Sequence, residues 1–431
     1  MGAAAATGLA AKAVSRNEAP YGGRLLHLTD SFGAQQSGTT GAPELYKAPA
    51  GGAVWAEQLS LGRLTFDIAN NKGVNGETSA QILARLNSDA LSRKSAWDVC
   101  LIDAGRNDAA ASKADGDATI GNIQLMASLV RKEGKLPCVM LPNPPRSFAP
   151  DGAANRSVRG YVNQQLRQWC AANNIPFVDY WRDCADPTSS GGGAWATGMS
   201  ADTLHPNSAG SRPIGLRVID ALSPYVAGLS FSQAAWDGYD ATLSPKGNVI
   251  GLTGANVPLV LPGGGNGTLS GTSLTGTIPQ NTFMNLYSGT GACACTITSP
   301  SAAAGYGAVG SGKVNFAVSS VTAAAGWEWY GGFTIPAALA GQQVVVEMTA
   351  EIASMSSAGA FTYGAYGRGG TGGSNGEFLN GVFLANEKLL IRTAPSTVGN
   401  NGAFFQWAFG LFAAVGASGT VSVSNPVIRP Q

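Results

Sequence analysis

Charged residues are scarce in this chain of 431 residues. Lys, Arg, Asp and Glu together make up 12% of it, and the formal net charge is +1. So weak a charge argues against a nucleic-acid partner and against attraction to an anionic membrane surface. Apolar runs are also short: residues 407–417 fall well below the roughly 18 residues that a membrane-spanning helix needs. We therefore expect no nucleic-acid partner and no membrane insertion.

Potential metal ligands are few as well. The chain has two histidines and six cysteines, and the cysteines lack the spacing of a zinc site. Cys293 and Cys295 are separated by a single residue, which is too tight for an easy disulfide and supplies only two potential ligands. Cys170 and Cys184 could pair, but nothing in the sequence requires it. We expect no metal site.

The composition of the chain changes near residue 230. Before this point, short apolar runs alternate with segments of helical periodicity, which predicts a parallel sheet covered by helices on both faces. The runs that read as strands are 25–29, 98–103, 136–141 and 175–180. The predicted fold class of this first part is therefore α/β, with a doubly wound parallel sheet.

After residue 240, Gly, Ser, Thr and Ala dominate and helical periodicity disappears. About seven or eight short strand-like runs with Gly-rich turns predict an antiparallel β-sandwich. The expected organisation has four parts. They are an N-terminal arm (1–22), the α/β domain (23–230), a β-rich connector (231–282) and the sandwich (283–431).

Asp202 stands three residues before His205, one of the two histidines of the chain. A carboxylate at this spacing can hold the imidazole ring and leave its other nitrogen free to act as a base. Pro206 disfavours helical geometry at His205, so we expect the pair on a loop that enters the last helix. Ser31 directly follows the first predicted strand, at the edge of the sheet where ligands bind in such folds. A base, its orienting acid and a serine predict a serine hydrolase.

Two further polar segments lie between these residues: 71–78, just before a predicted helix, and 103–108, at the end of a predicted strand. In this order the blocks resemble the SGNH/GDSL hydrolase family, over roughly residues 23–225. The resemblance implies an SGNH-type flavodoxin-like sheet and a serine esterase that needs no cofactor. It also implies roles for five residues: nucleophile Ser31, base His205, orienting acid Asp202, and oxyanion donors from the amides of Ser31 and Gly76 and from the Asn107 side chain. The alternative for each is a structural role, as a cap, a turn or an ion pair.

The neighbours of these residues are expected to be structural. Thr29 stands where the family usually has Gly, which can alter the geometry of the loop but carries no chemistry. His27 lies inside the first strand and is predicted to be packed in the core. Asp30 and Asp108 are predicted to hold loops together. Arg106 is predicted to be solvated, with contact to an acidic sugar as the alternative.

The second half of the chain holds aromatic residues that could stack on sugar rings. They are Trp327, Trp329, Tyr330, Tyr363, Tyr366 and Trp407. Alternation in the Trp327–Glu328–Trp329 run puts the two tryptophans on one face, which we expect to be the interior. The closing run 418–427 resembles the final strand of jelly-roll carbohydrate-binding modules. This resemblance implies a jelly roll and leaves the carbohydrate-binding residues unknown.

A hydrolase domain joined to a Gly/Ala/Thr-rich β-domain is similar to receptor-binding spikes and fibres of phages and phage-like particles. We therefore expect a carbohydrate O-acetylesterase that acts on cell-surface polysaccharide from the surface of a virion or a phage-like particle, with the N-terminal arm as the anchor. The expected assembly is a homo-oligomer or a complex with other particle proteins. Three alternatives stay open. They are a lipase-like or thioesterase-like SGNH esterase, a glycan-binding adhesin, and a secreted esterase.

Overall fold

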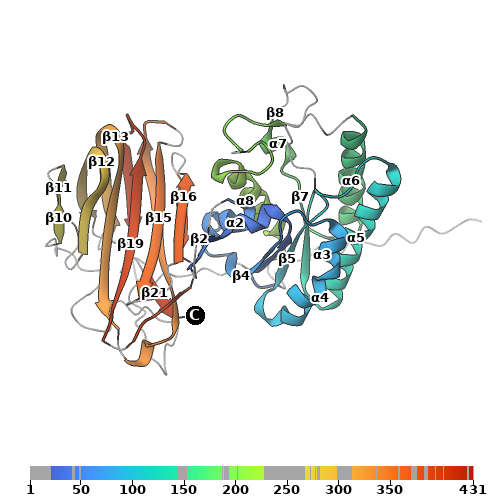
Figure 1. Cartoon of the computed structure of the whole chain (residues 1–431), viewed down its shortest axis with the longest axis horizontal. Helices are drawn as coiled ribbons and strands as arrows, with labels where there is room; N and C mark the ends of the chain where they lie inside the picture. Colours follow the sequence, from blue (N-terminus) through green and yellow to red (C-terminus); the bar gives the residue numbers. More distant parts are fainter. Residues whose placement is uncertain are drawn as a thin grey trace, which may run out of the picture.

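A computed structural model of the chain describes a large part of the sequence in two parts that lie side by side (Figure 1). The described residues are 21–40, 44–47, 50–142, 153–186, 188, 194–200, 202–227, 267–271, 273–276, 278, 282–298, 313–335, 337–357, 360–369, 376–382, 387–393, 395–400, 402–424 and 427–430. Most of the predicted arm (1–22) and of the predicted connector (231–282) lies outside these residues.

The first part is an α/β domain built on five parallel strands in the order β4-β1-β5-β6-β7. The strands are β1 (Arg24–Thr29), β4 (Thr65–Gly73), β5 (Val99–Asp103), β6 (Leu136–Met140) and β7 (Phe177–Val178). Counted along the sheet, this is the 2-1-3-4-5 order of flavodoxin-like doubly wound folds. The predicted α/β fold class is confirmed.

Helices cover both faces of this sheet because successive side chains of each strand point to opposite sides. On one face, Leu25 packs with α2 (Gly52–Leu59) and α8 (Ser208–Leu222). On the other face, Leu26 packs with α3 (Ser79–Ala84), α5 (Lys113–Lys132) and α6 (Ala153–Ala172). The smaller elements are α1 (Ser31–Ala34), α4 (Leu86–Asp89), η1 (Leu91–Ala96), α7 (Trp181–Cys184), β8 (Ala185–Asp186) and β9 (Ala194–Trp195).

One local feature differs from the sequence-based prediction, and another is unusual for a helix. Strand β4 was not predicted, because only alternate residues such as Phe66 and Ile68 are buried and polar residues follow them. Pro213 lies at the sixth position of α8, although helices tolerate proline best in their first turn. Since proline has no N–H group, the carbonyl of Ala209 loses its helical partner there.

The second part is a β-rich region whose strands pair mostly antiparallel. Exceptions are β10 and β11, which run parallel to β12. The elements are β10 (Thr268–Ser270), β11 (Leu274–Gly276), β12 (Thr282–Thr298), β13 (Lys313–Thr334), η2 (Ala337–Leu339), β14 (Gln343–Met355), β15 (Phe361–Gly369), β16 (Gly376–Val382), β17 (Lys388–Arg392), β18 (Ser396–Thr397), β19 (Phe404–Ala413), β20 (Gly419–Ser424) and β21 (Val427–Pro430).

Strand β13, with 22 residues, is the longest strand that the structure describes in this region. Its first part pairs with β20 and its last part with β19. Strand β13 therefore changes its pairing partner along its length. Strand β14 lies against β15. The closing run, predicted as one strand, divides into β20 and β21. A mostly antiparallel β-rich region is confirmed, and the jelly-roll topology stays a prediction.

Aromatic side chains fill the interior of this region. Trp327, Trp329, Tyr363 and Trp407 are all buried, and the rings of Trp329 and Trp407 meet edge to face with centroids 5.0 Å apart. The prediction that the two neighbouring tryptophans of β13 point inward is confirmed.

The α2 and α8 layer lies between the parallel sheet and the β-rich region (Figure 1). The Tyr363 hydroxyl of β15 donates a hydrogen bond to Gln58 Oε1 of α2, and Arg212 of α8 forms an ion pair with Glu387. A hairpin of β2 (Ser37–Thr40) and β3 (Glu44–Lys47) also reaches the second part, where β3 pairs with β16. Both polar contacts and main-chain pairing therefore join the two parts.

All six cysteines are buried with free thiols. None of the helices in the described part of the chain is both long enough and apolar enough to cross a membrane.

Candidate active site

Ser31 and His205, far apart in the sequence, meet at the carboxyl edge of the parallel sheet. Ser31 is the first residue of the short helix α1, directly after β1. Asp30 caps this helix, with its Oδ1 accepting a hydrogen bond from the Phe32 amide at 3.0 Å. The Ser31 Oγ atom lies 2.9 Å from His205 Nε2, within hydrogen-bond distance.

Asp202 holds the other side of the His205 ring. Its Oδ2 lies 2.6 Å from His205 Nδ1, and its Oδ1 accepts hydrogen bonds from the amides of His205 (2.7 Å) and Leu204 (3.0 Å). With Nδ1–H donating to the carboxylate, Nε2 faces Ser31 with its lone pair. The pair lies on the loop before α8, as Pro206 predicted, and Asn207 caps that helix.

The Asp202 carboxylate is strongly biased towards its charged form. Burial acts to raise its pKa, but hydrogen bonds from the His205 ring and from two backbone amides outweigh burial and lower the pKa to about 2. Its side chain is 50% exposed, against 17% for His205. The carboxylate can therefore stabilise an imidazolium in the neighbouring ring near neutral pH, while the pair stays open to solvent.

The predicted oxyanion residues lie on loops around Ser31. Gly76 has a φ of +76°, and a Cβ built on it would meet no atom within 4 Å, so backbone conformation alone calls for glycine there. The Asn107 Nδ2 group donates to Glu77 O at 3.0 Å and lies 3.4 Å from Asp30 Oδ2. Asn107 thus connects the residue after Gly76 with the residue before Ser31. The Ser31 amide, at the first position of a helix, has no acceptor within that helix.

A buried arginine lies beneath this group. Arg106 is 1% exposed and forms ion pairs with Asp103 (2.6 Å) and Asp30 (3.1 Å). Its guanidinium carbon lies 3.8 Å from the centroid of the Phe32 ring, which in turn is 5.7 Å from the His205 ring. The prediction of a solvated Arg106 is wrong. Asp30 and Asp103 lie at the ends of the adjacent strands β1 and β5. Because both carboxylates are buried, they need a cation between them, and Arg106 supplies it.

His27 belongs to the same network, and its predicted place in the core is confirmed. Its Nε2 lies 3.3 Å from Asp103 Oδ2, and its Nδ1 lies 2.7 Å from the Gln36 side-chain amide. Thr29, where the family usually has Gly, donates its hydroxyl to the same Asp103 oxygen at 3.3 Å. The departure from the family pattern therefore adds a hydrogen bond below the site.

The two buried carboxylates respond differently to their surroundings. For Asp103, burial acts to raise the pKa, but the Arg106 charge and hydrogen bonds from His27 and Arg106 lower it overall. For Asp30, burial is the largest influence, and with the charge of Asp103 it raises the pKa despite Arg106. Asp30, which shares the Arg106 cation with Asp103, is thus the less stabilised of the two carboxylates.

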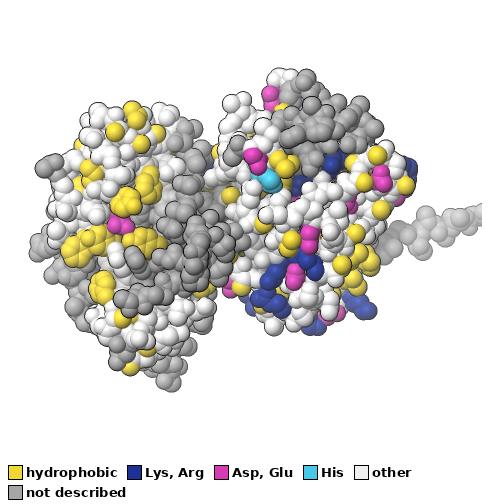
Figure 2. Space-filling view, viewed as in Figure 1, with side chains coloured by type: hydrophobic (Ala, Val, Ile, Leu, Met, Phe, Trp, Pro, Cys, Tyr) yellow, Lys and Arg dark blue, Asp and Glu magenta, His cyan; other side chains and the backbone are white. Residues whose placement is uncertain are grey.

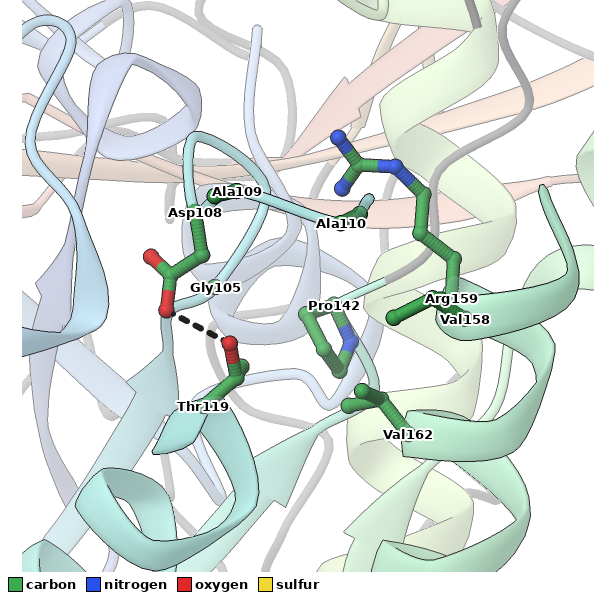
Figure 3. Close-up of a pocket in the computed structure, with 9 residues that line it drawn as sticks. All are labelled: Gly105, Asp108, Ala109, Ala110, Thr119, Pro142, Val158, Arg159 and Val162. Carbon is green, nitrogen blue, oxygen red and sulfur yellow. Dashed lines mark hydrogen bonds between the residues drawn. The ribbon is translucent and has the colours of Figure 1, made fainter. Parts of the chain in front are cut away.

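Asp108 fastens the loop that carries Asn107. It accepts hydrogen bonds from the Ser79 amide (2.6 Å) and the Thr119 hydroxyl (2.8 Å), which joins α3 and α5 to the loop. Its predicted structural role is confirmed. Figure 3 shows it beside a cavity lined by Gly105, Asp108, Ala109, Ala110, Thr119, Pro142, Val158, Arg159 and Val162. The cavity holds about 10 Å³, which is room for one water molecule and not for an acyl chain.

The structure thus brings Ser31, His205 and Asp202 together and sets Asn107 beside them. Sequence reasoning missed Arg106 as a buried ion-pair partner and Phe32 as the ring between it and His205. The signal was present in the acidic residues at the ends of β1 and β5, but their proximity depends on strand pairing. Among the described residues, no group of three or more His, Cys, Asp or Glu side chains is placed to hold a metal ion.

A serine, a histidine and a carboxylate in hydrogen-bonded series at the carboxyl edge of a flavodoxin-like sheet form the arrangement of a serine hydrolase. Residues 28–212 match the model of the GDSL-like lipase/acylhydrolase family. Over these residues the chain is therefore similar to the GDSL/SGNH lipases and acylhydrolases.

Several solved structures are similar to the chain. A GDSL-like lipase from Bacteroides thetaiotaomicron is 19% identical, with 46% of this chain and 87% of that chain covered and a TM-score of 0.34. A lipase/acylhydrolase from Enterococcus faecalis is 19% identical (47% and 97% covered, TM-score 0.34). An acetylxylan esterase from Geobacillus stearothermophilus is also 19% identical (49% and 99% covered, TM-score 0.36). No curated protein sequence matches the chain.

Proposed function

We propose that this protein is a serine-dependent O-acetylesterase that removes acetyl groups from a cell-surface polysaccharide. The observation that carries the proposal is the continuous series of short contacts at the sheet edge. Ser31 Oγ lies 2.9 Å from His205 Nε2, and His205 Nδ1 lies 2.6 Å from Asp202 Oδ2. This geometry suits transfer of the serine proton to the imidazole.

In the proposed reaction, Ser31 Oγ attacks the acetyl carbonyl carbon while His205 Nε2 takes the serine proton. His205 then returns that proton to the sugar oxygen as the C–O ester bond breaks, which leaves an acetyl group on Ser31. Water, deprotonated by His205, attacks the acetyl-serine, and His205 passes that proton to Ser31 Oγ as the acyl C–O bond breaks, which releases acetate and restores the serine. Asp202 keeps the ring in one tautomer and stabilises its positive charge throughout.

The negative charge of each tetrahedral intermediate requires hydrogen-bond donors. We assign these to the amides of Ser31 and Gly76 and to the Asn107 side chain. Removal of one such donor typically costs about 3 kcal/mol of transition-state stabilisation. The present bond from Asn107 to Glu77 O would have to be exchanged for, or shared with, the oxyanion.

A bulky polymer is the substrate that the exposure of the site favours. The Asp202 side chain is half exposed, Gly76 is exposed and Ser31 is partly exposed, so within the part of the chain that the structure describes the site is open to the surface. The β-rich region that packs against α2 and α8 supplies a second large surface next to the hydrolase domain. This layout supports the further proposal of a receptor-binding spike on a virion or phage-like particle, with a homo-oligomer or other particle proteins as its assembly.

Incubation with O-acetylated cell-surface polysaccharides tests the substrate, with free acetate as the measured product and Ser31→Ala as the blank. We expect acetate from the wild type and none from the variant. A series of 4-nitrophenyl esters tests the acyl group, and we expect the highest kcat/KM for acetate. Preference for chains of about eight carbons or more would indicate a lipase or thioesterase, and polysaccharide binding without acetate release would indicate an adhesin.

A further inference from the structure

The β-rich region presents partly exposed aromatic side chains around a carboxylate, on the face of the sheet opposite to the one that carries the buried tryptophans. Figure 2 shows hydrophobic side chains gathered around acidic atoms on this part of the molecule. We call the group the aromatic face, and it consists of Phe283, Glu328, Tyr330, Tyr366, Gln406 and Phe412 on strands β12, β13, β15 and β19.

Strand alternation and register put these residues on one side of the sheet. On β13, Trp327 and Trp329 are buried, so the intervening Glu328 and the following Tyr330 point outward. Tyr330 pairs with Phe283 on one side and with Ala408 on the other, and Ala408 pairs in turn with Tyr366. One row across four strands thus carries three aromatic rings.

The Tyr366 side chain lies across β19. Its hydroxyl donates a hydrogen bond to Glu328 Oε1 at 2.6 Å, although β15 and β13 are separated by β19. At about 4.8 Å between neighbouring strands, the side chains span roughly 10 Å along the surface of the sheet. The β19 residues beneath are Ala408 and Gly410, which are too small to lift the ring away from the backbone.

Phe412 also lies flat. A Cβ built on Gly326 would come within 2.7 Å of its ring and one built on Gly410 within 3.0 Å, so the ring rests on two glycines. The rings of Phe283 and Tyr330 stack with centroids 5.3 Å apart and planes 19° from parallel. Phe283 remains 42% exposed and Phe412 36% exposed. The result is an aromatic platform in which Phe412 lies low on the sheet and the rings of Phe283 and Tyr330 stack on each other.

Polar groups are built into this platform. Besides Tyr366, Gln406 takes part, since its Nε2 lies 3.3 Å from the Tyr366 hydroxyl. Asn285 pairs with Glu328 in register, and its Oδ1 has no hydrogen-bond partner among the residues that the structure describes. Aromatic rings with an adjoining carboxylate and amides match a ligand that has one apolar face and a rim of hydroxyl groups.

We infer that the aromatic face is a binding site for a neutral polysaccharide. The C–H face of a pyranose ring would stack on the aromatic rings, as weak C–H contacts to π systems allow. Its hydroxyl groups would donate to Glu328, a charge-assisted hydrogen bond, and exchange hydrogen bonds with Gln406. A carboxylate at the centre disfavours an anionic chain, because two negative charges would be brought together.

This site is separate from the ester-cleaving site and complements it. Figure 2 shows histidine and acidic side chains exposed together on the α/β domain, on the same side of the molecule as the platform. A polymer bound to the platform would therefore lie on the same side of the molecule as the ester-cleaving site. The inference concerns binding alone and stands or falls independently of ester hydrolysis.

Binding is tested in the full chain carrying Ser31→Ala, so that no acetyl group is removed during the measurement. Native gels containing laminarin, arabinoxylan, galactomannan or dextran report affinity through retarded migration. We expect at least one of these neutral polymers to retard the protein. Adding Tyr330→Ala weakens that binding about tenfold through loss of one stacking ring, Phe283→Ala weakens it several-fold, and Tyr330→Trp retains it.

The matched control is Tyr161→Ala, which removes a partly exposed tyrosine from α6 of the α/β domain and leaves retardation unchanged. Thermal melting of each variant confirms that it is folded, and Phe283→Ala replaces Tyr330→Ala as the decisive variant if the latter does not fold. The inference is overturned if none of the four polymers retards the protein. It is also overturned if the Tyr330→Ala and Phe283→Ala variants are retarded as much as the protein with the unchanged aromatic face. A fall in oligomeric mass with Tyr330→Ala also overturns it, because the face would then be a contact between copies of the chain.

Discussion

At the scale of single residues, Asp30 and Asp103 share one cation beneath the candidate nucleophile. Arg106 reaches both carboxylates and stacks on Phe32, and it is almost completely buried. Removal of one partner from a buried ionic group leaves an uncompensated charge, which is more costly than the pair itself is favourable. Arg106 therefore supports the loop of Ser31 through charge, without contact to the substrate.

Arg106→Gln should lower the free energy of unfolding by about 3–5 kcal/mol, since two carboxylates would remain buried without a cation. Urea denaturation measures this loss. The control is Arg217→Gln on α8, whose side chain is 46% exposed and paired with Asp183, and it should cost less than about 1 kcal/mol. Equal losses in the two variants would contradict the buried network.

Asp202→Asn should reduce kcat by about 10⁴-fold, because an amide can hold the wrong tautomer of His205. Steady-state kinetics with a chromogenic acetate measures the change, and thermal melting shows that the variant is folded. A loss of less than tenfold would mean that Asp202 has a structural role only.

The lowered pKa of Asp202 predicts a pH dependence of stability with a definite sign. The carboxylate is favoured in the folded state, so its contribution is complete above its ordinary pKa of 3.8 and is lost as the pH falls through about 2. The difference in Tm between wild type and Asp202→Asn should therefore be constant from pH 7 to about pH 5 and shrink towards pH 3. A difference that grows on acidification would have the wrong sign.

At the scale of elements, the turn between β4 and α3 sets the position of a proposed oxyanion donor. Gly76 has a positive φ and open space around it, so Gly76→Ala meets backbone strain of about 1–2 kcal/mol but no steric clash. If the turn relaxes, the amide shifts from the site. We expect kcat to fall about 100-fold with little change in the overall fold.

Gly134→Ala is the matched control for this turn. Gly134 follows α5, has a φ of +73° and also has no atom within 4 Å of a Cβ. Its substitution carries the same backbone cost at a distance from Ser31, so kcat should be unchanged. Similar losses of kcat in both variants would show that strain alone, rather than the Gly76 amide, accounts for the effect.

The elements also show what the sequence could predict. Buried central strands such as β1 and β5 read as continuous apolar runs, and the catalytic candidates follow them directly, so both were predictable from local sequence. Strand β4 and the first part of β12 alternate or mix polar residues, which blurs their signal. The burial of Arg106 could not be predicted, because it depends on the pairing of β1 with β5, about 75 residues apart in sequence.

At the scale of the whole molecule, α2 is the element that both parts share. Glu57 of this helix is fully buried, accepts a hydrogen bond from the Phe66 amide of β4 at 3.0 Å and lies 3.5 Å from Arg392 Nη1 of β17. The next residue, Gln58, accepts a hydrogen bond from the Tyr363 hydroxyl. Buried polar contacts of this kind are lost together when either part unfolds.

We therefore expect one unfolding transition for the two parts in scanning calorimetry. Tyr363→Phe leaves the Gln58 oxygen without this donor and should lower stability by about 1–3 kcal/mol while the transition remains single. Two separated transitions in the wild type, with the substitution shifting only one of them, would contradict the shared interface.

The central claim is that Ser31 is the nucleophile of an acylhydrolase, and Ser31→Ala tests it most directly. Hydrolysis of 4-nitrophenyl acetate by the purified full chain is followed in parallel with circular dichroism of both proteins. We predict that kcat falls by a factor of about 10⁴ or more while the spectrum and Tm stay the same. Unchanged turnover by a folded Ser31→Ala protein would contradict the account.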